Sequence, residues 1–392
     1  MSALTRVSQL KMGLHDTNVQ WETDTSVSYK QLELFGDVTA KLDVGKNPNE
    51  SLRDDGLHYA DDDGVKATGL SIPLKLRGIS SGAGATISAA RLTKTEIGFI
   101  LDSIMGAAGS DGTGATCSSA STTAPTVDET SGFPVGNAAL LTVGGVLVGR
   151  QVTARGASSG SNTITLDRAL AGSPSTTVVY GSASWALTKN ANPIHLAADW
   201  ETDAYDRYKL YGLMGGFSIP LPPNGGTVPF NVELEGTHWA RTATGLTFSA
   251  PTVGSTIPAI NSPILFGTTQ YDLSNAEVSV EVVKQPRAHY ASINGHTGFD
   301  VVDKIARLKG RLRAGSLTGE ISSTVLATLQ DNATFDVLLQ VGATVGATAL
   351  FRWPALAIRS AKLVKDNGRW AIDFEAFGSR PSTGSEFYMH LF

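Results

Sequence analysis

Several features that would indicate a particular chemistry are scarce in this sequence. Cys117 is the single cysteine among 392 residues, so the chain has no intrachain disulfide framework and no thiolate metal site. No run approaches the roughly 18 apolar residues of a membrane helix, and the opening segment lacks the apolar core of a signal peptide. Charged residues make up only 17% and the net charge is −5. These values exclude an overall basic surface of the kind that binds nucleic acid. We therefore expect no membrane insertion, and synthesis and folding in cytosol.

Catalytic signatures are absent as well. The chain contains no H-E-x-x-H, no G-x-S-x-G and no phosphate-binding G-x-x-x-x-G-K-[ST] pattern. His289 and His296 stand seven residues apart, which makes a poor pair of metal ligands. Asp199, Glu201 and Asp203 share one face of a predicted strand, and such a row is typical of an exposed strand. We expect no enzyme activity and no cofactor or metal.

Glycine is abundant, with 42 residues, and Ser, Thr and Ala dominate many stretches. Low charge with frequent turns is typical of β-rich folds. An amphipathic helix is expected at 93–106, where apolar residues recur at helical spacing from Ile97 to Met105 and Gly106 or Gly109 ends the element. A second helix is expected at 322–333. The sequence thus predicts a mainly β protein with a few short helices.

Composition also divides the chain. Residues 109–126 are predicted to form a flexible Gly/Ser/Thr linker, and the short alternating strands that follow predict a small all-β unit inserted at 116–181. A Ser/Thr/Pro-rich connector follows later. The predicted organisation is a first module at 1–115 and 182–245, with the insertion at 116–181 between its two parts. A linker at 246–263 and a second module at 264–392 follow.

Two stretches of sequence support a duplication. "FNVELEG" at 230–236 and "IDFEAFG" at 372–378 align apolar on apolar, Glu on Glu and Gly on Gly. Each follows an Asn-Gly pair, the strongest short signal for a type I′ hairpin turn. Because strands and helices also fall at comparable places in the two halves, we interpret them as copies of one strand–helix–strand module.

The chain resembles the tail tube proteins (major tail proteins) of long-tailed bacteriophages. The resemblance is carried by "LSIPLKLRG" followed by "TKTEIGFILDSIMGA", by "NTITLDRAL" in the insertion, and by "ALAIRSAKLVKDNGRWAIDFEAFG" near the end. It implies β-sandwich or half-barrel modules, each with a flanking helix, whose sheets join across subunits into a barrel. Such rings stack into the tube through which the genome leaves the capsid.

The resemblance implies a structural virion protein in the phage tail, whose partners are other copies of itself, a tape measure protein, and tail-terminator or tail-tip proteins. Two modules per chain predict a homotrimeric ring with pseudo-sixfold symmetry, and a hexameric ring is the alternative. Double-stranded DNA passes without specific binding. The candidate channel-lining residues are Asn231, Glu233, Glu235, Asp373 and Glu375.

Other interpretations stay open. The same acidic residues would also keep an outer strand soluble and protect a sheet edge. The basic residues of "RLKGRLR" are assigned to contacts with acids of a neighbouring ring: Arg307, Lys309, Arg311 and Arg313. The rival function is a tail-tip or surface adhesin whose insertion contacts a host glycan, although Phe133 and Tyr180 are among few aromatic residues there. A β-rich hydrolase would require a close nucleophile–base pair.

Overall fold

The computed structural model describes most of the chain. The described residues are 9–15, 27–47, 62–79, 97–110, 112–119, 121–128, 130–156, 162–189, 192–202, 207–223, 225–242, 254–260, 262–288, 296–313, 334–366, 369–379, 381 and 384–392. The expected helix at 322–333 and the Asn-Gly turn at 367–368 lie outside them.

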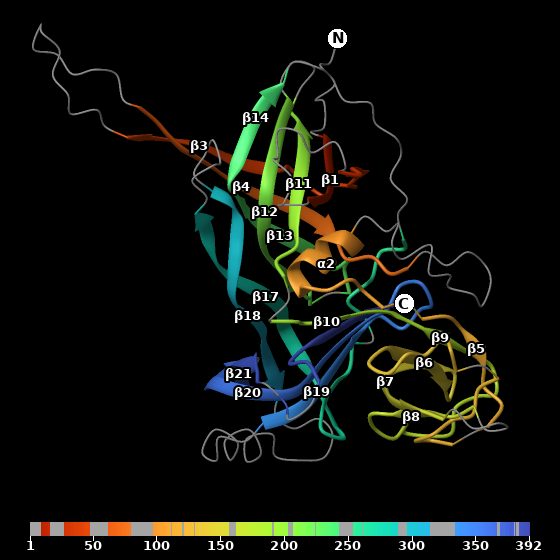
Figure 1. Cartoon of the computed structure of the whole chain (residues 1–392). Coiled ribbons are helices and arrows are strands. Elements are labelled where there is room, and N and C mark those ends of the chain that lie inside the picture. The colour runs from red at the N-terminus through yellow and green to blue at the C-terminus, as the bar shows by residue number, and fades with distance from the viewer. Residues whose placement is uncertain are drawn as a thin grey trace, which may run out of the picture.

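Strands dominate the described residues, as Figure 1 shows. Outside the insertion they are β1 Gln9–His15, β2 Lys30–Gln31, β3 Thr39–Asn47, β4 Asp62–Lys75, β10 Ala183–Ala186, β11 His195–Glu201, β12 Arg207–Pro220, β13 Pro229–Gly236, β14 His238–Thr242, β15 Ile264–Phe266, β16 Thr269–Tyr271, β17 Leu273–Ala288, β18 His296–Arg313, β19 Thr334–Val341, β20 Ala349–Asp366, β21 Arg369–Gly378 and β22 Tyr388–Leu391. These strands form one 17-stranded sheet that curls into a half-barrel. The expectation of a mainly β fold is confirmed.

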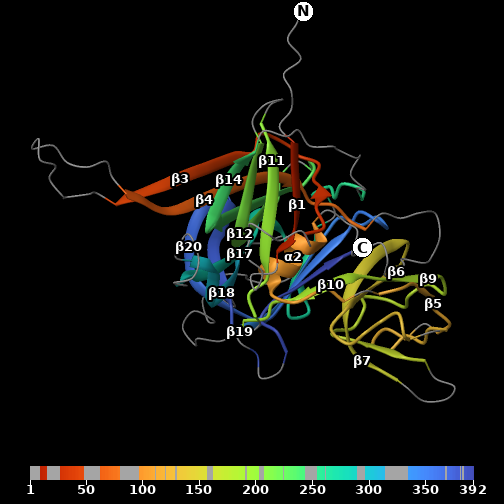
Figure 2. The ribbon, with the colours of Figure 1, turned by 45° about the horizontal axis from the view of Figure 1, so that its top comes forward.

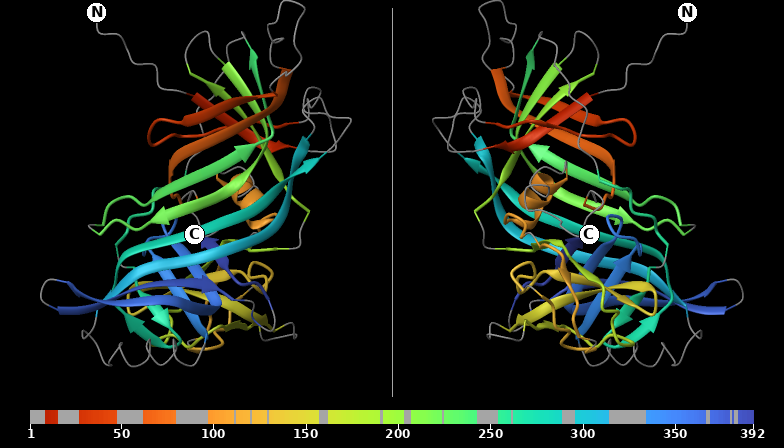
Figure 3. Two further views of the ribbon diagram at one scale, coloured as in Figure 1. Left: turned by 90° about the vertical axis from the view of Figure 1, so that its left-hand side faces the viewer. Right: turned by 90° about the vertical axis from the view of Figure 1, so that its right-hand side faces the viewer.

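Eight of these strands follow one another as hydrogen-bonded antiparallel neighbours. Their order in space is β3, β4, β13, β12, β17, β18, β21 and β20. We call this run the eight-strand sheet. Its long strands cross the left-hand view of Figure 3, with helix α2 seen behind them.

Two long strands leave the eight-strand sheet to join a second layer. The first half of β12 pairs with β11 and β14, and its second half pairs with β13 and β17. The first half of β20 pairs in the same way with β19 and β22, and its second half with β21. Because both strands bend from one layer into the other, the sheet encloses its own core.

One helix, α2 (Gly98–Met105), appears in the described part of the chain. It begins after Ile97 and ends at Gly106, whose φ of 88° is the left-handed conformation that favours glycine. Its apolar stripe is buried in the main core beside β12 and β10. The expected apolar stripe is therefore confirmed, while the helix residues expected before Ile97 lie outside the described residues.

We expect Ile100→Ala to lower the free energy of unfolding by about 2–5 kcal/mol, because Ile100 is fully buried and the change leaves a cavity. Chemical denaturation of the two proteins would measure the difference. An unchanged unfolding midpoint would mean that the stripe packs against a partner molecule instead of this core.

The residues of the expected insertion form a sheet of their own. It contains β5 Ala115–Thr116, β9 Val178–Gly181, β6 Ala138–Val143, β7 Val146–Arg155 and β8 Ile164–Leu166, in that spatial order. Figure 2 shows these strands grouped at one side of the molecule. Phe133 is buried in their own apolar cluster, and Tyr180 packs toward the main body. In the described residues, therefore, neither Phe133 nor Tyr180 belongs to an exposed aromatic surface.

The expectation of a flexible linker at 109–126 is wrong for the residues that the structure describes there. Cys117 is buried and bridges Val127, and Ser110 bridges Ser184. Polar side chains complete the pairing, since the Thr116 backbone N–H donates to Asp128 at 2.6 Å. Ser and Thr here supply local hydrogen bonds that ordered loops also use, so composition misled the prediction.

Candidate functional site

One face of the eight-strand sheet is buried and the other is polar. Along β13, Phe230, Val232 and Leu234 are buried in the main core, and the residues between them point to the opposite side. The other strands alternate in the same way, because successive side chains of a strand point to opposite faces. We call the opposite side the polar face; its residues include Ser71, Ser218, Asn231, Glu233, Glu235, Glu277, Ser279, Glu281, Arg307, Lys309, Arg311, Lys362, Asp373 and Glu375, none of which is buried.

The structure places all five candidate channel-lining residues on the polar face. Glu233 and Glu235 are exposed, and Asn231 is half-buried beside them on β13. Asp373 and Glu375 are half-buried on β21, three strands away. The two acidic rows thus share one surface, and its role as a channel wall stays a prediction.

The basic residues of β18 lie on the same face and contact acids of the same chain. The Arg311 guanidinium donates to both Asp373 oxygens, Nε to Oδ1 at 2.6 Å and Nη2 to Oδ2 at 3.1 Å. Lys309 Nζ lies 3.5 Å from Glu375 Oε1. Arg307 is paired closely with Glu281 of β17. Three of the four bases assigned to a neighbouring ring therefore have partners within the chain, and their contact with another ring stays a prediction.

Arg313 ends β18 opposite Ala371 of β21. Its backbone continues the pairing of the two strands, which positions the other three bases beside the acids. The structure describes the course of its backbone and not its side chain, so its assignment to a ring contact also stays a prediction.

The polar face also carries charged residues that sequence reasoning did not select. Glu277 and Glu281 lie on β17, and Lys284 Nζ reaches Glu235 at 3.2 Å. Ser71 donates a hydrogen bond to Glu233 Oε1 at 3.0 Å. Apolar and polar residues alternate in "AEVSVEVVKQ", and Glu277 and Glu281 both occupy polar positions of that alternation. The sequence could therefore have indicated that both lie on the polar face. The complete face is a mixed-charge surface and not an acidic one.

The hydrogen bonds between Arg311 and Asp373 lower the pKa of the Asp373 carboxyl group and raise the pKa of the Arg311 guanidinium. A carboxyl group whose pKa is lower in the folded state contributes stability above its unfolded pKa, near 3.8, and that stability disappears as the pH falls through its folded pKa.

We therefore expect Asp373→Asn to give a slightly lower melting temperature than the original protein at pH 7. The two melting temperatures should converge as the pH falls below about 4, because protonation then removes the same charge from Asp373. Thermal melts at several pH values check this. A difference that stays constant down to pH 2 would show that the ion pair is not its cause.

In the described residues, the strand at each edge of the eight-strand sheet has no strand partner along all or part of its outer side. In the described part of the chain, β3 pairs only with β4, and residues 358–366 of β20 pair only with β21. Leu363 lies in this free part of β20 with half of its surface exposed (50%). An unpaired strand edge with an exposed apolar residue is a template for pairing with another chain.

One serine–histidine contact in the described residues has the spacing of a catalytic pair. Ser184 Oγ and His390 Nδ1 lie 2.8 Å apart, which is the distance of a nucleophile–base pair. Both residues are buried, and burial lowers the pKa of His390 to about 3. His390 Nε2 has no hydrogen-bond partner among the described residues, so no acidic group orients the ring there. The pair is a buried structural contact that substrate does not reach.

No group of three His, Cys, Asp or Glu among the described residues is arranged to hold a metal ion. No helix in the same residues is long and apolar enough to cross a membrane.

No protein-family model matches the chain. No curated protein matches it significantly in sequence.

Proposed function

We propose that this chain is the structural subunit of a phage tail tube. Three copies close a ring, rings stack into a tube, and double-stranded DNA passes along the polar face without specific binding. The observation that carries the proposal is the eight-strand sheet, because one of its faces is polar and both of its edges are free in the described residues. A sheet with these properties is suited to closing a barrel with copies of itself, which removes exposed edges.

A repeated strand order supports the duplication. In the first half, β3, β4, β12 and β13 lie in the spatial order β3, β4, β13, β12. In the second half, β17, β18, β20 and β21 lie in the order β17, β18, β21, β20. The aligned stretches 230–236 and 372–378 fall on β13 and β21, which occupy the same place in each set. We infer that the halves are two copies of one four-strand module.

The pairing of β12 with β17 then serves as the template for pairing between copies. Within the chain, Ile219 of β12 lies opposite Val278 of β17, and both are fully buried. In the duplicated register, Leu363 corresponds to Ile219, and Ala40 of β3 corresponds to Val278. We therefore place Leu363 of one copy opposite Ala40 of the next, where its exposed side chain would be covered.

The size of the barrel favours three copies. About 24 strands at roughly 4.8 Å spacing and a tilt near 45° give a backbone radius of about 25 Å. Side chains reduce the channel to a width of about 40 Å, and a duplex about 20 Å wide, judged from its groove depths, passes through it.

The charges of the polar face are compatible with this passage. Affinity for DNA comes largely from cations that bind phosphates. On this face Arg311, Lys309 and Arg307 already contact carboxylates of the same chain. Such a wall offers DNA few cations that are not already paired.

Negative-stain electron microscopy of the purified protein tests the proposal. We expect rings or tubes with a central channel. A monodisperse monomer at high protein concentration, with no ring in any preparation, would contradict it.

A further inference from the structure

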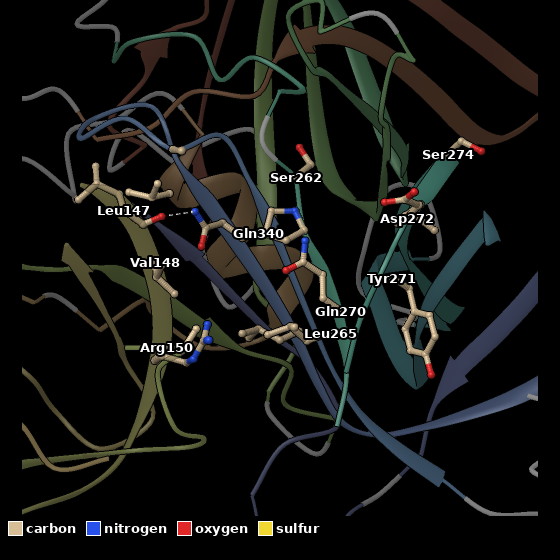
Figure 4. A pocket seen from close by; sticks show the side chains of 16 residues that line it. Leu147, Val148, Arg150, Ser262, Leu265, Gln270, Tyr271, Asp272, Ser274 and Gln340 are labelled. Atoms are coloured by element: carbon tan, nitrogen blue, oxygen red, sulfur yellow. Dashed lines mark hydrogen bonds between the residues drawn. The ribbon is translucent and has the colours of Figure 1, made fainter. Parts of the chain in front are cut away.

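A cavity of about 590 Å³ lies where the insertion meets the main body. Its lining comes from β7 of the insertion on one side and from β15, β16, β19 and their flanking residues on the other. Figure 4 shows Arg150 on β7 reaching toward the space in front of Leu265. The volume falls within the range of about 300–1,000 Å³ that is typical of sites for small molecules.

The two sides of the cavity are held together firmly. The Gln340 side chain accepts a hydrogen bond from the Gly149 backbone N–H at 2.8 Å and donates to the Leu147 carbonyl at 2.9 Å. Beneath these bonds, Leu140 of the insertion packs with Leu338 and Leu350 of the body. The cavity is therefore a fixed feature of the fold, since strands on both sides of it are anchored to each other.

Arg150 is a buried cation in the wall of this cavity. Only 7% of its surface is exposed, and burial lowers its pKa to about 10, so it remains protonated at neutral pH. Its Nη1 donates to the Gly149 carbonyl at 2.8 Å, while its Nε has no acceptor among the described residues. A buried guanidinium with an unsatisfied donor is costly unless an acceptor is supplied.

The surroundings leave this charge without a full counterpart. The carboxylate of Asp167 contacts Arg168 and Arg352, and Asp336 contacts the same two arginines. With Arg150 added, three arginines, of which Arg150 and Arg168 are buried, face two carboxylates. Figure 4 shows Asp272, another acidic residue of the lining, on the opposite side of the cavity from Arg150.

The remaining lining combines apolar walls with neutral polar groups. Val148 and Leu265 form apolar surface, and Gln270 and Ser262 supply an amide and a hydroxyl group. A guanidinium donates charge-assisted hydrogen bonds to the oxygens of a carboxylate.

The geometry points to a binding site for a sugar acid, whose carboxylate pairs with Arg150 and whose hydroxyl groups contact Gln270 and Ser262. This role is separate from ring formation and belongs to the seam between the insertion and the body.

Calorimetric titration of the full-length protein with glucuronate tests the site. We expect saturable binding of glucuronate and none of glucose, which has the same ring without the carboxylate. Arg150→Gln should weaken glucuronate binding tenfold or more, because charged hydrogen bonds at a buried site are lost. Arg155→Gln is the matched control, since Arg155 is an exposed arginine on the same strand; it should leave the affinity unchanged.

Three results would overturn the assignment. They are no glucuronate binding by the folded original protein, equal binding by the Arg150 variant, and inorganic phosphate binding as tightly as glucuronate. If Arg150→Gln does not fold, the selectivity of the original protein for glucuronate over glucose and phosphate decides the question alone.

Discussion

Leu363→Lys is expected to abolish ring and tube formation while the chain still folds. Half of the surface of Leu363 is exposed in a single copy, so a lysine there reaches solvent at little cost to the monomer. In the proposed ring the same position is covered by Ala40 of the next copy. A buried ammonium group without a partner costs several kcal/mol, and a closed ring repeats that cost at each of its three junctions.

Sedimentation velocity and negative-stain microscopy would measure this outcome. Val135→Lys provides the control, because Val135 is an apolar residue of similar exposure (58%) in the insertion, away from both edges. The control should assemble as the original protein does. Tubes of normal appearance from Leu363→Lys would exclude the free part of β20 as a subunit contact.

Paired cysteines at Ala40 and Leu363 are expected to join neighbouring copies covalently. Within one chain these residues lie on opposite edges of the eight-strand sheet, separated by about 34 Å if seven strand spacings of roughly 4.8 Å are counted, so they cannot bond to each other. Between copies, the duplicated register places them directly opposite, at a distance that permits a disulfide. Native Cys117 is buried and does not compete.

The expected product of mild oxidation is a covalent species of three chains on a non-reducing gel. Each single cysteine variant should remain monomeric on that gel. Lys362→Cys combined with Ala40→Cys should also fail to crosslink, because a shift of one residue moves the side chain to the other face of the sheet. Efficient crosslinking of this shifted pair, without crosslinking of the Leu363 pair, would show that the register is wrong.

Much of the eight-strand sheet could be predicted from local patterns. The alternation of "FNVELEG" and "IDFEAFG" correctly predicted which residues of β13 and β21 are buried, because the two-residue period of a strand is local. The stripe of α2 was predicted for the same reason, with a period of 3.6 residues. Patterns of this kind need no knowledge of which strands become neighbours.

Features that depend on neighbours could not be predicted in this way. Asp199 and Glu201 were expected on an exposed strand, yet they are 2% and 6% exposed on β11. Arg207 of the adjacent β12 forms an ion pair with Asp199, which compensates its burial. The alternation of charged and apolar residues does not reveal that such a partner will arrive from the next strand.

The candidate site shows the same limit. Its acidic residues could be selected from sequence, but the pairing of Arg311 with Asp373 depends on β18 lying beside β21, and β19 and β20 come between them in the chain. The cavity beside Arg150 was also beyond sequence reasoning. It is formed by strands from the insertion and from the body, which lie more than a hundred residues apart in sequence.

The number of chains in each ring tests the central proposal most directly. A cryo-electron microscopy reconstruction of isolated rings or tubes would count the chains and locate the eight-strand sheet of each. The proposed duplication predicts three chains per ring, about 24 strands around the channel, and rows of acidic residues from β13 and β21 about 60° apart on its wall. Six chains per ring, or a channel wall formed by a different surface, would contradict it.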